Sequence, residues 1–482
     1  MKKIYFILLS SILFMLMTTG SIRAQFSISA EFKTRGEYRD GYIILRDSSK
    51  TPVVDLLGRG RLLFDYKNEK ITTRFSLYDA IVFGQNNYSS DTISKNTVNI
   101  YEVFFKYNFT KSFAVKIGRT ELAYNDERLL GTSSWSMWGA THDIILVQWE
   151  VPGIKYRGDF GFAINNVAPA TPYLSSYPLR NYKYMAFLYE QKKFLDDKLS
   201  ISFLGLIDAF QKTSKTTTTK TTKNDTLTVK DPAGNIIGYT VNTTTAISTK
   251  VTDYPTHLYA RFTVGLDGMA RLKKWNIFLS GFYQGGHYTD GRKINANFYT
   301  LWVSFQALKS LKLMAGYEHL SGNDFSDTTE FKKTVKGFST LYGTGHRFYG
   351  YMDLFTVLIR NNLSTGLNDL YGRVTYTFFK EKMSLEGTYR WFSIPHNYLF
   401  VANPKAGTLP YQKVDKSLGS EIDLMYIYKP IPNLELNAAY CFFLPTNTME
   451  LMSNLKAGTS KWAQYAYIMV TYKPNFFNSE KK

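Results

Sequence analysis

A stretch near the N-terminus reads Phe26-Ser27-Ile28-Ser29-Ala30-Glu31-Phe32-Lys33, in which apolar and polar residues alternate. A period of two places the apolar side chains on one face of a β-strand and the polar side chains on the other. The same alternation recurs at 61–66, 100–107, 258–264, 373–378 and 421–428. Because helical periodicity is nearly absent, the sequence predicts an all-β protein.

A soluble β-sandwich would also alternate, with its apolar face inside. Two features favour a transmembrane antiparallel β-barrel instead. The alternating segments often reach ten residues or more, close to the roughly 9–11 that cross a bilayer at a tilt. Tyr66, Tyr107, Tyr428 and Tyr472 stand at segment ends, where interfacial aromatic girdles are found. Since backbone groups in lipid must all be paired, such a sheet has to close on itself.

The connections between segments differ in length, as short periplasmic turns and long external loops do in outer-membrane barrels. We expect about 18 strands, a number in keeping with the even counts of single-chain bacterial barrels. Segment 347–360 is left open as either a strand or part of a loop, and 212–254 is compatible with a short hairpin pairing 226–229 with 235–241. The expected short turns are 67–70, 108–111, 380–382 and 429–433, and the expected long loops are 84–96, 124–140, 212–254, 321–346 and 395–415.

Residues 1–24 have the layout of a secretory signal peptide: basic Lys2 and Lys3, an apolar run from Ile4 to Thr19, and the small residue Ala24. The rival interpretation is an N-terminal anchor helix, for which the apolar run is short. We therefore expect a barrel over 25–474, a short C-terminal tail over 475–482 and no plug domain.

The chain has 482 residues and a formal charge of +19, from 58 basic and 39 acidic residues. Cleavage after residue 24 would remove Lys2, Lys3 and Arg23 and leave +16. An exported protein is not an intracellular nucleic-acid binder, so the charge indicates other anionic partners, namely lipopolysaccharide or an acidic solute. Outer-membrane lipids and the barrel-assembly machinery complete the expected partners.

The residues that usually carry catalysis or bind metals form no recognisable motif. Six histidines are scattered, no His-Glu-x-x-His pattern occurs, and Cys441, beside two phenylalanines, is the one cysteine and is expected to face lipid. We expect no catalytic residue, no metal site and no cofactor. An outer-membrane hydrolase, or a surface-binding barrel with a blocked lumen, stays open as the alternative function.

One region is more specific than the alternation. It runs over 116–131, as Lys-Ile-Gly-Arg-Thr-Glu-Leu-Ala-Tyr-Asn-Asp-Glu-Arg-Leu-Leu-Gly, followed by Trp135 and by Gly-Ala-Thr-His-Asp at 139–143. This pattern resembles the alginate export outer-membrane family, and segments 345–353, 366–371 and 418–424 are similar to later family patterns. The chain departs from the family at Thr120, where glutamine is preferred, and at Ala140, where arginine is common. The resemblance implies a monomeric outer-membrane barrel of about 18 strands with a basic pore for an anionic polysaccharide.

A barrel this wide would hold water against its polar face, so the inward charged residues are candidates for the path of a solute. A basic surplus there lowers the barrier for anions, and the planar guanidinium of arginine suits carboxylates. The alternative is that the inward charges neutralise one another and only keep the lumen hydrated, so that diffusion through it is non-selective. Strand parity selects Arg35, Arg59, Arg61, Arg74, Arg157, Arg261, Arg373, Arg390, Glu421 and Asp423 for this path, and the family-like segment adds Arg119, Asp126, Glu127, Arg128 and Asp143.

The segment 124–140 carries Trp135 and Trp138 and admits two interpretations. It folds inward and narrows the pore, or it stays outside with its tryptophans at the membrane rim. The expected function is a passive outer-membrane channel that favours anionic solutes, including acidic oligosaccharides. Polymer export together with periplasmic partners is a further option that the sequence leaves undecided.

Overall fold

The computed structural model describes residues 24–47, 49–84, 98–166, 181–211, 215–230, 232, 236–252, 258–356, 365–400, 411–460 and 462–479. Within that part of the chain, eighteen strands close into one antiparallel β-barrel. Closure comes from the pairing of β1 (Gln25–Asp40) with β23 (Ala463–Tyr472), in which Phe32 lies opposite Tyr472. The predicted all-β barrel of about 18 strands is confirmed.

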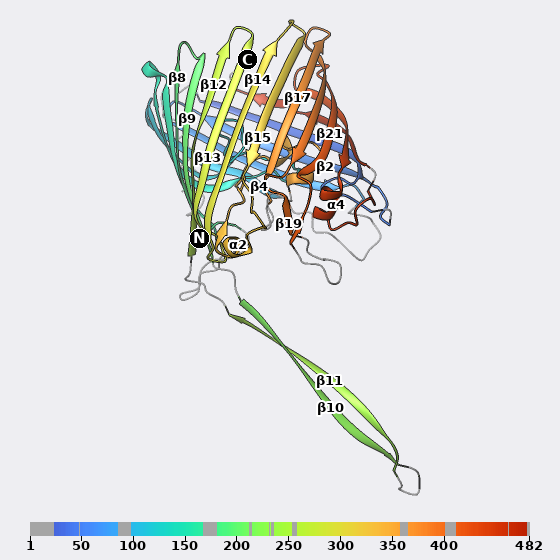
Figure 1. Ribbon diagram of the computed structural model, residues 1–482. Helices are drawn as coiled ribbons and strands as arrows, with labels where there is room; N and C mark the ends of the chain where they lie inside the picture. Colours follow the sequence, from blue (N-terminus) through green and yellow to red (C-terminus); the bar gives the residue numbers. More distant parts are fainter. Residues whose placement is uncertain are drawn as a thin grey trace, which may run out of the picture.

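The remaining barrel strands follow one another around the wall, each paired with its neighbour in sequence order (Figure 1). The first half consists of β2 (Val53–Lys67), β3 (Ile71–Val82), β4 (Asn99–Thr110), β5 (Phe113–Thr120), β6 (His142–Val151), β7 (Tyr156–Ile164), β8 (Tyr184–Phe194) and β9 (Leu199–Gln211). The second half consists of β12 (Leu258–Leu272), β13 (Trp275–His287), β14 (Lys293–Gln306), β15 (Leu311–Leu320), β17 (Leu367–Phe378), β18 (Met383–Ser393), β21 (Ser417–Tyr428) and β22 (Leu434–Pro445).

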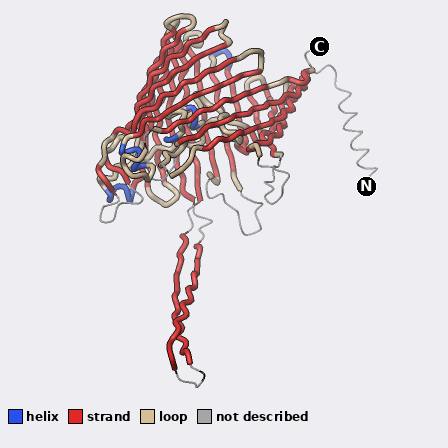
Figure 2. The backbone as a smooth tube through the Cα atoms, turned by 90° about the vertical axis from the view of Figure 1, so that its right-hand side faces the viewer, coloured by secondary structure: helices blue, strands red, loops and turns tan. Residues whose placement is uncertain are grey.

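Short turns gather at one end of the barrel and long loops at the other (Figures 1 and 2). The turns at 68–70, 379–382 and 429–433 lie where the sequence predicted them, whereas the turn expected at 108–111 lies at 111–112 because β4 extends to Thr110. The segment left open between strand and loop, 347–360, belongs to the long β15–β17 loop (321–366) as far as residue 356, and 357–364 lie outside the described residues. The loop end also carries α2 (Thr328–Lys333), β16 (Thr334–Val335), η2 (Gly345–Arg347), β19 (Tyr398–Phe400), β20 (Tyr411–Lys413) and α4 (Asn447–Met452), whereas η1 (Pro152–Ile154) lies in a short turn.

Between β9 and β12 the chain forms a hairpin that projects from the loop end of the barrel (Figure 1). It consists of β10 (Lys215–Lys230) and β11 (Ile236–Thr252), which pair antiparallel along their whole length. The short hairpin considered from the sequence is therefore only the tip of a longer one. Composition favours this extension, because threonine is enriched in strands and is the most frequent residue of β10 and β11.

The two ends of the chain were expected to be a signal peptide and a short tail. Residues 1–23 of the expected signal peptide lie outside the described residues. In the tail, Asn475–Asn478 form β24, which pairs with the start of β1 and places Phe477 opposite Ile28. None of the helices in the described residues is long and apolar enough to span a membrane.

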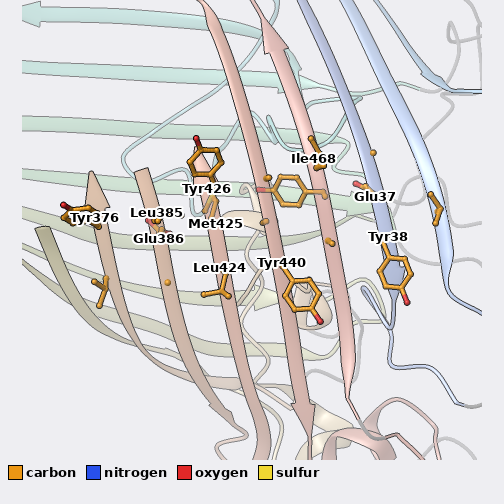
Figure 3. Close-up of a pocket in the computed structure, with 18 residues that line it drawn as sticks. Glu37, Tyr38, Tyr376, Leu385, Glu386, Leu424, Met425, Tyr426, Tyr440 and Ile468 are labelled. Carbon is orange, nitrogen blue, oxygen red and sulfur yellow. The ribbon is translucent and has the colours of Figure 1, made fainter. Parts of the chain in front are cut away.

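The apolar face of the sheet points outward, the reverse of a soluble sandwich. Phe32, Leu266 and Ile468 are 51%, 55% and 67% exposed, whereas polar residues of the same strands are buried inside. Aromatic and aliphatic side chains also line a groove of about 810 Å³ on the outer wall across β17, β18, β21, β22, β23 and β1 (Figure 3). An outward apolar band is what a barrel needs in order to sit in lipid.

Cys441 of β22 departs from its expected lipid-facing position. Its side chain is fully buried, opposite Tyr465 of β23 and Asp423 of β21, and it belongs to the cluster of apolar side chains inside the barrel. The alternation of β22 explains the difference, because Tyr440 is the neighbour that points outward and is 37% exposed.

This placement predicts low thiol reactivity. In the folded barrel, Cys441 is expected to react with N-ethylmaleimide at least about 100-fold more slowly than after denaturation, since a buried thiol reacts only when the structure opens locally. Mass spectrometry of folded and urea-denatured protein measures the labelling. Rapid labelling of the folded barrel in detergent would instead place the thiol on the lipid-facing surface.

Candidate functional site

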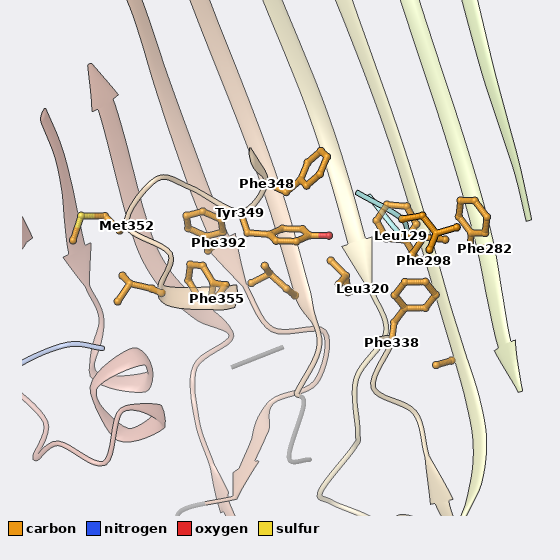
Figure 4. Close-up of a cluster of buried hydrophobic side chains, with 14 of the residues drawn as sticks. Leu129, Phe282, Phe298, Leu320, Phe338, Phe348, Tyr349, Met352, Phe355 and Phe392 are labelled. Carbon is orange, nitrogen blue, oxygen red and sulfur yellow. The ribbon is translucent and has the colours of Figure 1, made fainter. Parts of the chain in front are cut away.

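Two long loops fold into the lumen and meet there. They are the β5–β6 loop (121–141) and the β15–β17 loop, and they form the constriction of the barrel. Leu130 and Tyr342 make a parallel bridge, and the Tyr342 backbone donates to the Leu129 carbonyl at 3.0 Å and accepts from Gly131 at 3.1 Å. Buried apolar side chains from both loops and from the wall pack around this contact (Figure 4). Of the two interpretations of segment 124–140, the inward fold is therefore the one that the structure shows.

A second contact between the loops joins Glu127 to Thr344. The Glu127 carboxylate accepts from the hydroxyls of Thr132 and Thr344, each at 3.0 Å, and the Thr344 hydroxyl accepts from the Ser133 backbone at 3.1 Å. Gly343 is needed for this approach, because a Cβ there would lie 1.9 Å from the carbonyl oxygen of Arg128. These hydrogen bonds and the close packing at Gly343 hold the two loops together.

Arg128 fastens the constriction to the barrel wall. It is 4% exposed and donates to both carboxylate oxygens of Glu318 on β15, at 2.6 and 3.0 Å. It also donates to Asp126 at 3.2 Å, and its guanidinium lies 3.8 Å from the Phe348 ring centroid. Although burial opposes the charged form, Glu318 and Asp126 raise the pKa of the Arg128 guanidinium well above its ordinary value.

Basic residues of β1 and β2 hold the other side of the β5–β6 loop through its backbone carbonyls. Lys33 donates to Ser134 at 2.7 Å, and Arg35 donates to Trp135 at 2.8 Å. Arg59 donates to the carbonyls of Ser136 and Met137, at 3.1 and 3.3 Å. Arg35 and Arg59 are also paired with Glu37 and Glu31, so their charges are largely engaged.

Trp135 lies where these contacts converge. Its ring stacks on His346 of the other loop, with centroids 3.7 Å apart and an interplanar angle of 8°. The Arg35 guanidinium lies 3.8 Å from the Trp135 ring centroid, and Tyr467 approaches edge-on at 4.8 Å. His346 is in turn held by Asp353, whose carboxylate lies 2.7 Å from its Nδ1 atom.

Below the constriction, toward the short turns, lies a cavity of about 1160 Å³. Its loop end is bounded by Ser134, Trp135, Thr344 and Arg347, and its other end by the 429–433 turn. The described residues that line it include eight basic and five acidic side chains, a basic surplus of three. The basic members are Lys33, Arg59, Arg61, Arg347, Arg373, Lys382, Lys429 and Lys473, and the acidic members are Glu31, Glu121, Glu127, Glu386 and Glu435.

Most of the residues predicted to line the path, by strand parity or from the family-like segment, lie inside the barrel, but few of them border the cavity. Arg59, Arg61, Arg373 and Glu127 line it. The others are engaged elsewhere in the lumen: Arg74 with Asp65 and Glu102, Arg261 with Asp208, Arg390 with Asp369 and Asp423, Glu421 with the Met352 backbone, Arg157 near the Tyr189 ring, and Arg35, Asp126 and Arg128 within the constriction contacts.

Arg119 and Asp143 differ from expectation, because they lie on the outer surface. They form a two-point ion pair at 2.7 and 2.9 Å between β5 and β6. Both alternate in step with the outward residues Ile117 and Ile145, which are 51% and 45% exposed. The assignment of this pair to the pore is therefore wrong, since side chains two positions apart on a strand share one face.

Several cavity residues had not been selected from the sequence. Lys382, Lys429 and Lys473 lie in or beside short turns, where lysine is common and carries no specific signal. Arg347 lies in a segment that resembles the family, but strand alternation does not apply in a loop and so could not predict the direction of its side chain. No group of histidine, cysteine and carboxylate side chains able to hold a metal ion occurs in the described part of the chain.

Comparison with known proteins agrees with this architecture. The sequence matches the alginate export family over residues 24–454. No curated protein matches it. Among solved structures, the chain is similar to the outer membrane protein OpdK from Pseudomonas aeruginosa, with a TM-score of 0.55, 11% identity and coverage of 94% of this chain and 99% of that one.

Two further structures show the same likeness of fold. Pseudomonas aeruginosa OccK2 (OpdF), solved in complex with glucuronate, gives a TM-score of 0.54 at 11% identity, with 94% and 98% of the two chains covered. Acinetobacter baumannii OccAB4 gives 0.51 at 10% identity over the same shares. With the family match spanning most of the sequence and the closed barrel that encloses the constriction, the chain belongs to the alginate export family and is an outer-membrane β-barrel channel.

Proposed function

We propose that the channel passes small solutes by passive diffusion and prefers anions. The observation that carries this proposal is the basic surplus of three among the side chains lining the cavity. A narrow, water-filled passage with low-dielectric walls concentrates ions of opposite charge, so a basic lining lowers the barrier for anions and raises it for cations. The two loops border this lining at the loop end of the cavity.

Acidic sugars are the solute class that we favour. Arginine presents a planar fork that matches a carboxylate, and Arg61, Arg347 and Arg373 all border the cavity. Glucuronate, the molecule in the OccK2 complex, is a sugar carboxylate of this kind. We further propose that the barrel is a monomer and performs no catalytic step. A cleaved signal peptide directs its export, the barrel-assembly machinery inserts it, and its surface contacts lipopolysaccharide.

Planar-bilayer recording tests the anion preference. In a tenfold KCl gradient, the reversal potential is expected to show that chloride is about two to five times as permeant as potassium, as weak electrostatic focusing predicts. Glucuronate is expected to reduce the chloride current more than glucose at equal concentration. Absence of conductance, or a reversal potential of the cation-selective sign, contradicts the proposal.

A further inference from the structure

The basic residues around the lumen fall into two groups that differ in exposure and in partners. In the first group, Lys33, Arg35 and Arg59 are 7%, 4% and 4% exposed and donate to backbone carbonyls of the β5–β6 loop. Each is directed at the protein itself. A buried cation of this kind positions the constriction and has little charge left for a passing ion, because its carboxylate or carbonyl partners already compensate it.

The second group consists of exposed cations that line the cavity. Lys429 and Lys473 lie near its short-turn end, and Arg347 lies at the constriction. The Arg347 side chain is 57% exposed. Within the described residues it pairs with Glu127 at 3.6 Å, a long and partly exposed contact of the kind that contributes little. The Arg347 guanidinium therefore keeps donors available to a solute, which the buried cations do not.

The position of Arg347 is nevertheless well determined. It ends η2, and its two sequence neighbours are fixed on either side. His346 stacks on Trp135 at 3.7 Å, and Phe348 lies beneath the guanidinium of Arg128 at 3.8 Å. Both neighbours are buried while Arg347 is exposed, so the backbone is held and the charged end alone reaches into the cavity.

We propose that Arg347 is a specificity-determining residue of the channel, and that Lys33, Arg35 and Arg59 are positioning residues that set the width of the constriction. The proposal rests on the anion preference proposed above and assigns two properties of the channel to two kinds of basic residue, exposed and buried. Selectivity depends on the exposed guanidinium of Arg347 on the β15–β17 loop, whereas conductance depends on the buried basic side chains of β1 and β2.

Neutralising Arg347 tests the first half. In the same KCl gradient, R347Q is expected to lower the chloride-to-potassium permeability ratio about twofold and R347E about fourfold, as a screened charge several ångströms from the ion path predicts. R347K is expected to retain chloride selectivity, since it keeps the charge. R119Q is the matched control, because Arg119 lies on the outer surface and its loss should leave the ratio unchanged.

The charge-neutral double variant R59M/E31Q tests the second half. It removes the donors to the Ser136 and Met137 carbonyls without changing net charge, and is expected to raise conductance or current noise while the permeability ratio stays at the wild-type value. Heat-modifiable migration on gels checks that every variant folds.

The outcomes separate the two levels of the argument. A wild-type channel without anion preference contradicts the proposed function itself. An anion-selective wild type whose ratio is unaffected by R347E, or is lowered as much by R59M/E31Q as by R347Q, overturns the inference and leaves the proposed function standing.

Discussion

Replacing Arg128 with methionine is expected to lower the free energy of unfolding by about 3–5 kcal/mol, because it leaves the buried Glu318 carboxylate without its partner. Glu318 is 2% exposed, so water cannot replace the two hydrogen bonds that it accepts from Arg128. The loss is expected to appear in urea unfolding of the detergent-solubilised barrel, followed by tryptophan fluorescence.

The double variant R128M/E318M separates charge from packing. Replacing both members of a buried ion pair by apolar groups is far less costly than removing one, so the double variant is expected to recover most of the stability. If the single and double variants lose the same free energy, the contribution of Arg128 comes from its packing over Phe348 and the ion-pair account fails.

Replacing Trp135 with alanine is expected to raise single-channel conductance at least about twofold, because ion flow follows the width of the narrowest part of a pore. The Trp135 ring stands at the loop end of the cavity, stacked on His346 and covered by Arg35. Its removal also breaks the ring contact between the two inner loops. Single-channel recording at symmetrical KCl measures the change.

Trp138 is the matched control, because it lies in the same loop but is 58% exposed. W138A is expected to leave conductance within the spread of wild-type channels. Equal effects of the two substitutions would show that the conductance responds to any change in the loop, and would remove Trp135 from the narrowest part of the pore.

The barrel could be predicted from local pattern because a strand that spans a bilayer has few choices. The alternation at 26–33 already separates outward Phe32 from inward Glu31 and Lys33, and the structure keeps this separation. The tyrosines at segment ends, Tyr66, Tyr107, Tyr428 and Tyr472, lie at or near the ends of β2, β4, β21 and β23 that adjoin the short turns. Each of these features can be recognised from residues that are close together in the sequence.

The candidate site was less predictable, because its contacts join residues far apart in the chain. Parity identified Arg35 and Arg59 as inward, but it could not show that the carbonyls of residues 135–137 would engage them. The assignment of Arg119 and Asp143 failed because a motif says nothing about which face of a strand its residues occupy. Arg347 was not predicted as a cavity residue because it lies in a loop, where the alternation of a strand no longer indicates which side chains point inward.

Strand alternation, turn spacing and the family-like segment are thus sufficient to predict an outer-membrane barrel of this family, since those features depend on neighbours along the chain and on the lipid that surrounds it. Which basic side chains are exposed to solvent is determined only by the tertiary structure. The sequence shows only a total excess of basic residues. The packing of the two inner loops buries Lys33, Arg35, Arg59 and Arg128 against carbonyls and carboxylates, whereas Arg347 stays exposed. Burial and pairing, not composition, determine how much of a charge remains for a solute.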